Sequence, residues 1–145
     1  MVTSMPTPTQ IKLVEQSFAR LVPIADIAAN IFYARLFQIA PDLLETLFRQ
    51  VDMAGQRKKL IQVLALAVKS LRQPEALLPV LRDLGRRHVR YGVRDEHYDT
   101  VGRALLWTVE RTVGGTFTPE VREAWRSVYA LVADTMKAGA RWDAA

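Results

Sequence analysis

The sequence predicts an all-helical protein, and three observations support this fold class. Apolar side chains recur at steps of three and four residues along most of the chain, as they do on one face of a helix. Two pairs, Thr7-Pro8 and Thr118-Pro119, combine a hydroxyl that can cap a helix with a proline suited to its first turn. No segment shows a convincing alternation of apolar and polar residues, the pattern of a half-buried strand. The periodic segments predict helices over residues 8–20, 24–39, 41–47, 54–71, 75–91, 95–112 and 118–138.

Glycines and apolar runs add detail to this expectation. Gly92, the pair Gly114-Gly115 and Gly139 follow or end periodic segments, where a residue that tolerates left-handed backbone often closes a helix. The segment Leu60–Leu71 is apolar on most of its faces. We therefore expect this segment to lie in the middle of the fold, with neighbours on both sides.

Length and composition indicate one folded domain over residues 1–145, with a short N-terminal extension of about residues 1–7. Hydrophobic residues make up 50% and charged residues 24% of the chain, which is too apolar for a disordered protein. The sequence has no cysteine, which excludes disulfides, thiolate nucleophiles and cysteine-ligated zinc or iron–sulfur clusters. No apolar run approaches the ~20 residues of a membrane span, and the first ten residues do not resemble a secretory signal. We expect a cytoplasmic protein without a membrane partner.

The formal net charge is +5, which raises the question of a polyanionic partner. Basic residues recur at Arg57-Lys58-Lys59, Arg86-Arg87, Arg90 and Arg94. Acidic residues such as Asp83, Asp95 and Glu96 are interspersed with them. This mixture is more typical of a solvated surface than of a binding stripe, so no nucleic-acid partner is expected.

Three polar side chains are predicted to point into an apolar interior. His88 continues the apolar stripe Leu77, Leu81 and Leu84 at a helical step, which places its imidazole on the inward face. His97, in contrast, sits among charged residues at a helix start, where a solvated polar role is the plain interpretation. On two other predicted helices, Tyr33 lies beside apolar aromatic residues and Gln56 shares a face with Leu60.

A buried hydroxyl or amide without a partner costs about 1–3 kcal/mol, so such groups are normally paired with protein, water or a ligand. Each of the three residues alone is more often structural. Together, on three helices and without a pair of catalytic carboxylates, they indicate a cofactor pocket. Its ligand would need one nitrogen donor on one side and hydrogen-bond donors on the other.

The segments FYARLF, LGRRHVRYGV, HYDTVGRALL and AWRSVYALVAD, in this order, resemble the globins over about residues 9–136. The similarity is to single-domain bacterial haemoglobins related to the haem domain of flavohaemoglobins. It implies the globin fold, a three-over-three helical sandwich around a haem pocket, with haem b as cofactor. It also implies that His88 bonds the iron and that Tyr33 and Gln56 form the distal pair beside a bound gas. The remaining haem-binding positions that it implies are Phe48, Leu60, Leu84, Val93, Tyr98 and, near the propionates, Arg87.

One position departs from the family pattern. Ala140 stands where flavohaemoglobins carry a glutamate that joins the proximal histidine and tyrosine in a hydrogen-bonded triad. The flavin and nicotinamide domains of flavohaemoglobins are not seen in the sequence either. The resemblance therefore implies reversible binding of O₂, NO or CO, with nitric oxide detoxification only if an external reductase supplies electrons.

Two alternatives remain at this point. One is a haem-based gas sensor that signals to a partner protein. The other is a helical protein without cofactor that binds nucleic acid through Arg57–Lys59 and Arg86–Arg94. No residue is assigned a catalytic role.

Overall fold

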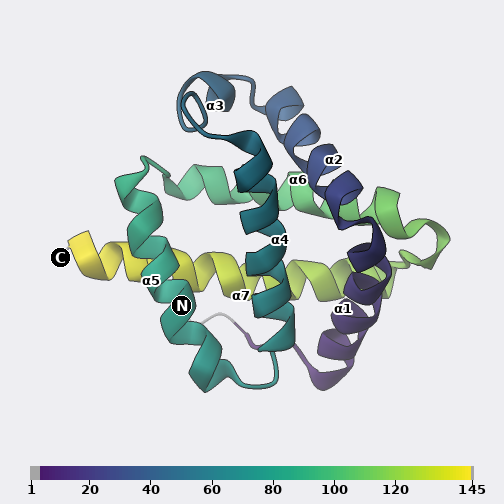
Figure 1. Cartoon of the computed structure of the whole chain (residues 1–145). Coiled ribbons are helices and arrows are strands. Elements are labelled where there is room, and N and C mark those ends of the chain that lie inside the picture. The colour runs from purple at the N-terminus through teal and green to yellow at the C-terminus, as the bar shows by residue number, and fades with distance from the viewer. Residues whose placement is uncertain (1–3, 145) are drawn as a thin grey trace.

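The computed structural model describes residues 4–144, of which 142–144 are described by their backbone only. The elements in this range are α1 (Pro8–Leu21), the 3₁₀ turn η1 (Val22–Ile24), α2 (Ala25–Ile39), α3 (Asp42–Glu45), α4 (Met53–Lys69), α5 (Pro74–Arg90), α6 (Asp95–Val113), η2 (Gly114–Thr116) and α7 (Pro119–Ala144) (Figure 1). Residues 4–144 contain no strand, so the predicted all-helical class is confirmed. Of the predicted N-terminal extension, residues 1–3 lie outside the described part, and Pro6 is buried.

The long helices form two layers. α1, α4 and α5 make one layer, and α2, α6 and α7 make the other. α5 packs across α7, α2 packs on α6, and α4 packs on α2 and α1 (Figure 1). This arrangement is the three-over-three sandwich expected from the sequence. Within residues 4–144, no helix combines the length and the apolar character needed to span a membrane.

The helix starts confirm the capping predictions. The Thr7 hydroxyl accepts a hydrogen bond from the Gln10 N–H at 3.1 Å, and the Gln10 side chain accepts one from the Thr7 N–H at 2.9 Å. At the start of α7, the Thr118 hydroxyl accepts from the Val121 N–H at 3.2 Å. In both helices a proline follows the capping threonine, where its missing N–H costs no helical hydrogen bond.

The predicted helix over residues 41–47 is wrong in its length, because α3 ends after a single turn. The Thr46 hydroxyl donates to the Asp42 carbonyl at 2.9 Å and so occupies an acceptor of the helical backbone. The Phe48 N–H then reaches back to the Leu43 carbonyl at 3.0 Å, which closes a turn instead of extending the helix.

Two further expectations about packing are also wrong. Gly139 does not end a helix, since α7 continues to Ala144. Instead, α5 crosses α7 at this point, and a side chain on Gly139 would overlap the backbone of Arg82. The segment Leu60–Leu71 does not lie in the middle of the fold: Ala67, Val68 and Leu71 are buried, but most other apolar residues of α4 are half-buried and Leu66 is exposed. One side of α4 packs on α1 and α2, while its remaining apolar surface is only partly covered.

A buried hydrogen bond joins the two layers near the N-terminus. Trp125 Nε1 on α7 donates to the Ser17 hydroxyl on α1 at 2.8 Å, and both side chains are buried. The Ser17 hydroxyl itself donates to the Leu13 carbonyl at 2.7 Å. We expect Ser17→Ala to lower the free energy of unfolding by about 1–3 kcal/mol, because the indole N–H loses its acceptor in a dry environment. Urea unfolding measures this change, and the exposed Ser4→Ala serves as control. Equal stability of the two variants would contradict the prediction.

Candidate functional site

The structure brings Tyr33 and Gln56 together, as predicted from the sequence. Gln56 lies in the first turn of α4, which Asp52 starts by accepting a hydrogen bond from the Ala54 N–H at 3.2 Å. From there the Gln56 Nε2 donates to the Tyr33 hydroxyl on α2 at 3.0 Å. Burial raises the pKa of Tyr33, although the hydrogen bond from Gln56 acts in the opposite direction. The phenol therefore stays protonated at neutral pH, and its own O–H remains free to donate to a ligand.

Aromatic rings surround the Tyr33 phenol. The ring of Phe32 lies 4.9 Å from that of Tyr33 between centroids, that of Phe48 5.7 Å and that of Phe37 6.0 Å. Phe48 also contacts Phe37, at 5.3 Å. Although Phe48 follows the short helix α3, the structure thus places it beside the predicted distal pair. This apolar packing fixes the Tyr33 ring in one orientation.

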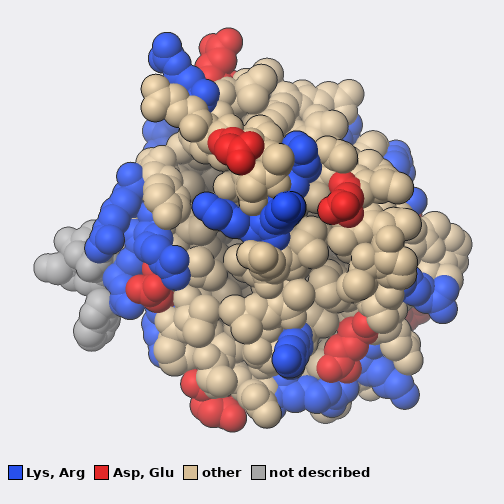
Figure 2. Space-filling view, viewed as in Figure 1, with Lys and Arg blue, Asp and Glu red and all other residues tan. Residues whose placement is uncertain are grey.

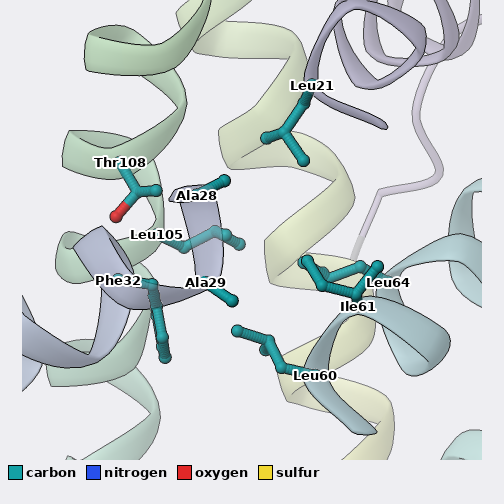
Figure 3. A pocket seen from close by; sticks show the side chains of 9 residues that line it. All are labelled: Leu21, Ala28, Ala29, Phe32, Leu60, Ile61, Leu64, Leu105 and Thr108. Atoms are coloured by element: carbon teal, nitrogen blue, oxygen red, sulfur yellow. The ribbon is translucent and has the colours of Figure 1, made fainter. Parts of the chain in front are cut away.

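A small apolar pocket, with a volume of about 10 Å³, lies next to these residues between α2, α4 and α6. Figure 3 shows Phe32 and Ala29 on one side of it and Leu60 on the other. Its one hydroxyl, that of Thr108, donates to the Ala104 carbonyl at 2.8 Å. A water molecule needs two or more polar partners to be stable, so this apolar lining disfavours water.

His88 on α5 is held in a single protonation pattern. Its Nδ1 lies 2.7 Å from the Leu84 carbonyl, and because a carbonyl can only accept, Nδ1 carries the proton. Burial lowers the pKa of His88; the bond to Leu84 acts against this, and the nearby Arg87 charge acts with it. The imidazole is therefore neutral at pH 7. Nε2 keeps a lone pair, for which the described part of the chain offers no hydrogen-bond donor.

The end of α5 fixes His88 and Val93 relative to each other. Gly92 has φ +90°, a conformation that favours glycine, and its N–H donates to the Val89 carbonyl at 3.0 Å. The Val93 N–H then donates to the His88 carbonyl at 3.0 Å. These two bonds form the Schellman motif that was expected for a helix-ending glycine.

The remaining predicted haem-binding residues differ in burial. Leu60, Leu84 and Val93 are half-buried and pack against the core. Tyr98 is buried, which raises its pKa to about 12, with a smaller contribution from Asp95. Arg87 is exposed and forms an ion pair with Asp83 at 2.9 Å. Their contacts with haem stay predictions.

Sequence analysis missed two features that position the site. The hydroxyl of Tyr129 donates to the backbone carbonyl of Tyr98 at 2.6 Å, and its ring lies so close to Gly102 that a side chain there would meet it at 2.6 Å. Gly85, three residues before His88, lies against the backbone of Met136 on α7. Gly85 on α5 and Gly139 on α7 mark the place where the two helices cross. Because these segments are distant in the sequence, apolar periodicity within either helix could not reveal the crossing.

The side chains that could ligate a metal fit a metal ion that a cofactor already holds through most of its ligands. The described residues contain no cluster of three histidine, cysteine or acidic side chains that could hold a metal ion alone. They do contain one neutral imidazole with a free lone pair, half-buried apolar side chains on α4 and α5, and a separate pair of hydrogen-bond donors. A porphyrin supplies four planar nitrogen ligands and a large apolar surface, and needs one such imidazole.

Comparison with known proteins agrees with this interpretation. The globin family model matches residues 30–136, a range that includes Tyr33, Gln56 and His88. The chain belongs to the globin family. With this result the predicted fold and the sequence resemblance are both confirmed, and the chain is a haem-binding globin.

Among curated proteins, this globin is similar to flavohemoproteins. It is 33% identical over 105 residues to the one of Bacillus subtilis, which covers 71% of this chain and 26% of that protein. It is also 33% identical over 106 residues to the one of Chromobacterium violaceum, which covers 72% of this chain and 26% of that protein. The chain spans about a quarter of the length of the curated relatives it matches.

Solved structures confirm the fold. A hexacoordinated heme protein from an anhydrobiotic tardigrade superimposes with a TM-score of 0.81 at 16% identity, covering 93% of this globin and 95% of that chain. An engineered carbene transferase made from RmaNOD of Rhodothermus marinus gives a TM-score of 0.84 at 23% identity, covering 95% of both chains.

Proposed function

We propose that this globin binds haem b through Nε2 of His88 and holds a diatomic gas beside Tyr33 and Gln56. O₂ is the ligand that the donors favour most, and NO and CO are further ligands. The observation that carries the proposal is the 3.0 Å hydrogen bond from Gln56 to the Tyr33 hydroxyl, because it leaves one O–H and one amide N–H free to donate into an apolar site. Haem would supply the iron at which the gas binds.

The side chains of this globin would orient the iron ligand, donate hydrogen bonds to the gas and exclude water from the site. The Leu84 carbonyl holds the His88 ring and keeps its proton on Nδ1, so that Nε2 is the atom offered to iron. Tyr33 and Gln56 donate to a ligand that carries partial negative charge, and they discriminate in favour of O₂ over CO for this reason. The aromatic rings of Phe32, Phe37 and Phe48 exclude water from the donors.

We further propose that electrons for nitric oxide detoxification come from a separate reductase. The relatives are flavohemoproteins, whose name joins a flavin to haem, and this supports a flavin-containing electron donor. The proximal side favours ligand binding over peroxide chemistry. A carboxylate that accepted a hydrogen bond from His88 would make the imidazole more electron-donating and so favour peroxide chemistry. Here His88 donates to a backbone carbonyl, and the corresponding position on α7 is the half-buried Ala140.

Substitution of either distal donor should speed O₂ release. Each hydrogen bond to a partly charged acceptor contributes about 1–2 kcal/mol, so Tyr33→Phe and Gln56→Leu should each raise the O₂ dissociation rate roughly tenfold. CO dissociation should change much less. Stopped-flow displacement of O₂ by CO measures the rates.

Gln62→Leu is the matched control, because Gln62 is an exposed glutamine on the same helix. Its O₂ dissociation rate should equal that of the unmodified protein. If Tyr33→Phe and Gln56→Leu also leave the rate unchanged, these residues are not the ligand-binding donors and the proposed function is wrong.

A further inference from the structure

Three arginines and one tyrosine form a surface at the end of α5, on which Arg86 is half-buried and the other three are exposed. Arg86 and Arg90 are four residues apart, as are Arg87 and Tyr91, so the four residues lie toward one side of the helix; we call this surface the α5 face. Tyr91 is 64% exposed. Figure 2 shows Lys and Arg side chains gathered over α5, at the left of the view, and over α4 near its centre.

The positive charge of the α5 face is only partly neutralised. A single carboxylate, that of Asp83, serves two arginines: it lies 3.4 Å from Arg86 and 2.9 Å from Arg87. Arg90 has no carboxylate partner among residues 4–141, and neither do Lys58 and Lys59 at the start of α4. The cations of both helices therefore add to a positive potential over this side of the protein.

The α5 face borders the proposed haem ligand. Arg87 directly precedes His88, and the Tyr91 ring lies 5.8 Å from the His88 ring between centroids. A protein bound at the α5 face would thus come close to His88.

We propose that the α5 face docks an acidic one-electron carrier protein that reduces the haem. This inference rests on the proposed function. One electron leaves the reduced flavin or metal centre of the carrier and passes to the haem iron, which goes from ferric to ferrous; no bond forms or breaks. Carriers of this kind bind through small interfaces, in which complementary charge raises the association rate and a few apolar groups form the centre.

A protein partner suits this surface better than a nucleic acid does. Val89 is 46% exposed and Tyr91 is 64% exposed, so the end of α5 presents apolar groups as well as arginines. Asp83 lies within the α5 face, and Glu96 pairs with Arg94 at 3.2 Å just beyond it. These carboxylates interrupt the positive charge that a continuous phosphate backbone would follow, whereas an acidic protein can place separate carboxylates against the arginines and neutral groups against Asp83 and Glu96.

Charge reversal tests the proposal. In haem-loaded protein, we expect Arg86→Glu with Arg90→Glu to lower the second-order rate of reduction by reduced flavodoxin, an acidic flavin carrier, at least about tenfold at low ionic strength. Binding of oxidised flavodoxin, measured by isothermal titration calorimetry, should weaken in parallel. Electron transfer from the ferrous protein to ferric cytochrome c, a basic carrier, should become faster. Reduction by dithionite and the O₂ dissociation rate should not change.

The matched control is Arg103→Glu with Arg126→Glu, in a groove of about 660 Å³ between α6 and α7 that none of the predicted site residues lines. As in the test pair, one arginine has an ion-pair partner and the other has none. A flavodoxin rate that is the same in both double variants would overturn the docking proposal. So would salt-sensitive binding of a duplex DNA that only the α5 reversal abolishes, with the flavodoxin rate unchanged.

The docking proposal and the proposed function fail in distinguishable ways. One outcome overturns the docking surface alone: the protein binds haem and releases O₂ normally, but charge reversal of the α5 face does not change its rate of reduction by flavodoxin. Protein that takes up no haem overturns the proposed function, and the docking proposal with it.

Discussion

Gly85→Ala is expected to destabilise the protein by about 3 kcal/mol and to accelerate haem loss. A methyl group at this position would overlap the backbone carbonyl of Met136, which is part of α7 and cannot rotate away as a side chain could. α5 and α7 would have to separate, and Gly139 on α7, which lies against the backbone of Arg82, fixes the same crossing from the other side. His88 follows Gly85 by one helical turn, so any shift of α5 displaces the imidazole.

The sign of this effect distinguishes packing from helix propensity. In an ordinary helix, replacement of glycine by alanine stabilises by about 1 kcal/mol. Urea unfolding should show a clear loss for Gly85→Ala instead. Gly115→Ala is the control, because a methyl group there meets no atom within 4 Å, and its free energy of unfolding should change by less than about 0.5 kcal/mol. A stabilised Gly85→Ala would show that the two helices do not cross as closely as the structure has them.

Local sequence patterns were sufficient to predict the helices. The segments expected at 54–71 and 95–112 correspond to α4 (Met53–Lys69) and α6 (Asp95–Val113), and the capping roles of Thr7 and Thr118 were correct. These features depend on residues within one or two turns of each other. Tyr33 and Gln56 stood out as polar groups on apolar helical faces, and the resemblance to the globins implied that they form a pair.

Apart from the helix expected over residues 41–47, which local hydrogen bonds end early, the errors concern contacts between segments that are distant in the sequence. Gly139 looked like the end of a helix, since the local sequence does not reveal that Arg82 lies against it. α4 looked like an interior helix because its apolar residues cover most faces, yet one of those faces is left half-buried in the protein. Haem-binding globins need such a face, so the misprediction and the proposed function have the same physical cause.

His88→Ala is expected to abolish stable haem incorporation. The substitution removes the half-buried imidazole whose Nε2 lone pair is free, and His97, the other histidine, lies at the start of α6 instead. The ratio of haem to protein after purification should fall from about one to near zero, measured by the absorption spectrum. His97→Ala is the matched control: His97 caps the start of α6, where its Nδ1 accepts from the Arg94 N–H at 2.9 Å, and its loss should leave haem content unchanged.

Acid provides an independent test of the same assignment. Nδ1 of His88 is already protonated and bound to the Leu84 carbonyl, so an added proton and an iron ion would compete for Nε2. Burial lowers the pKa of His88 below its ordinary value of 6.5, while unfolded protein titrates near that value. Below about pH 6.5 the unfolded state therefore binds more protons than the folded state, and stability falls as the pH decreases through this range.

Haem should consequently remain bound at pH 6.5 and dissociate only at lower pH, as protons reach Nε2. The measurement is the absorbance of haem in the protein against pH, with transfer of released haem to an acceptor protein. His97→Ala should leave the midpoint unchanged, because that residue does not contact the site. Haem retention by His88→Ala at neutral pH, or a midpoint that moves with His97 instead, would assign the iron to a different ligand.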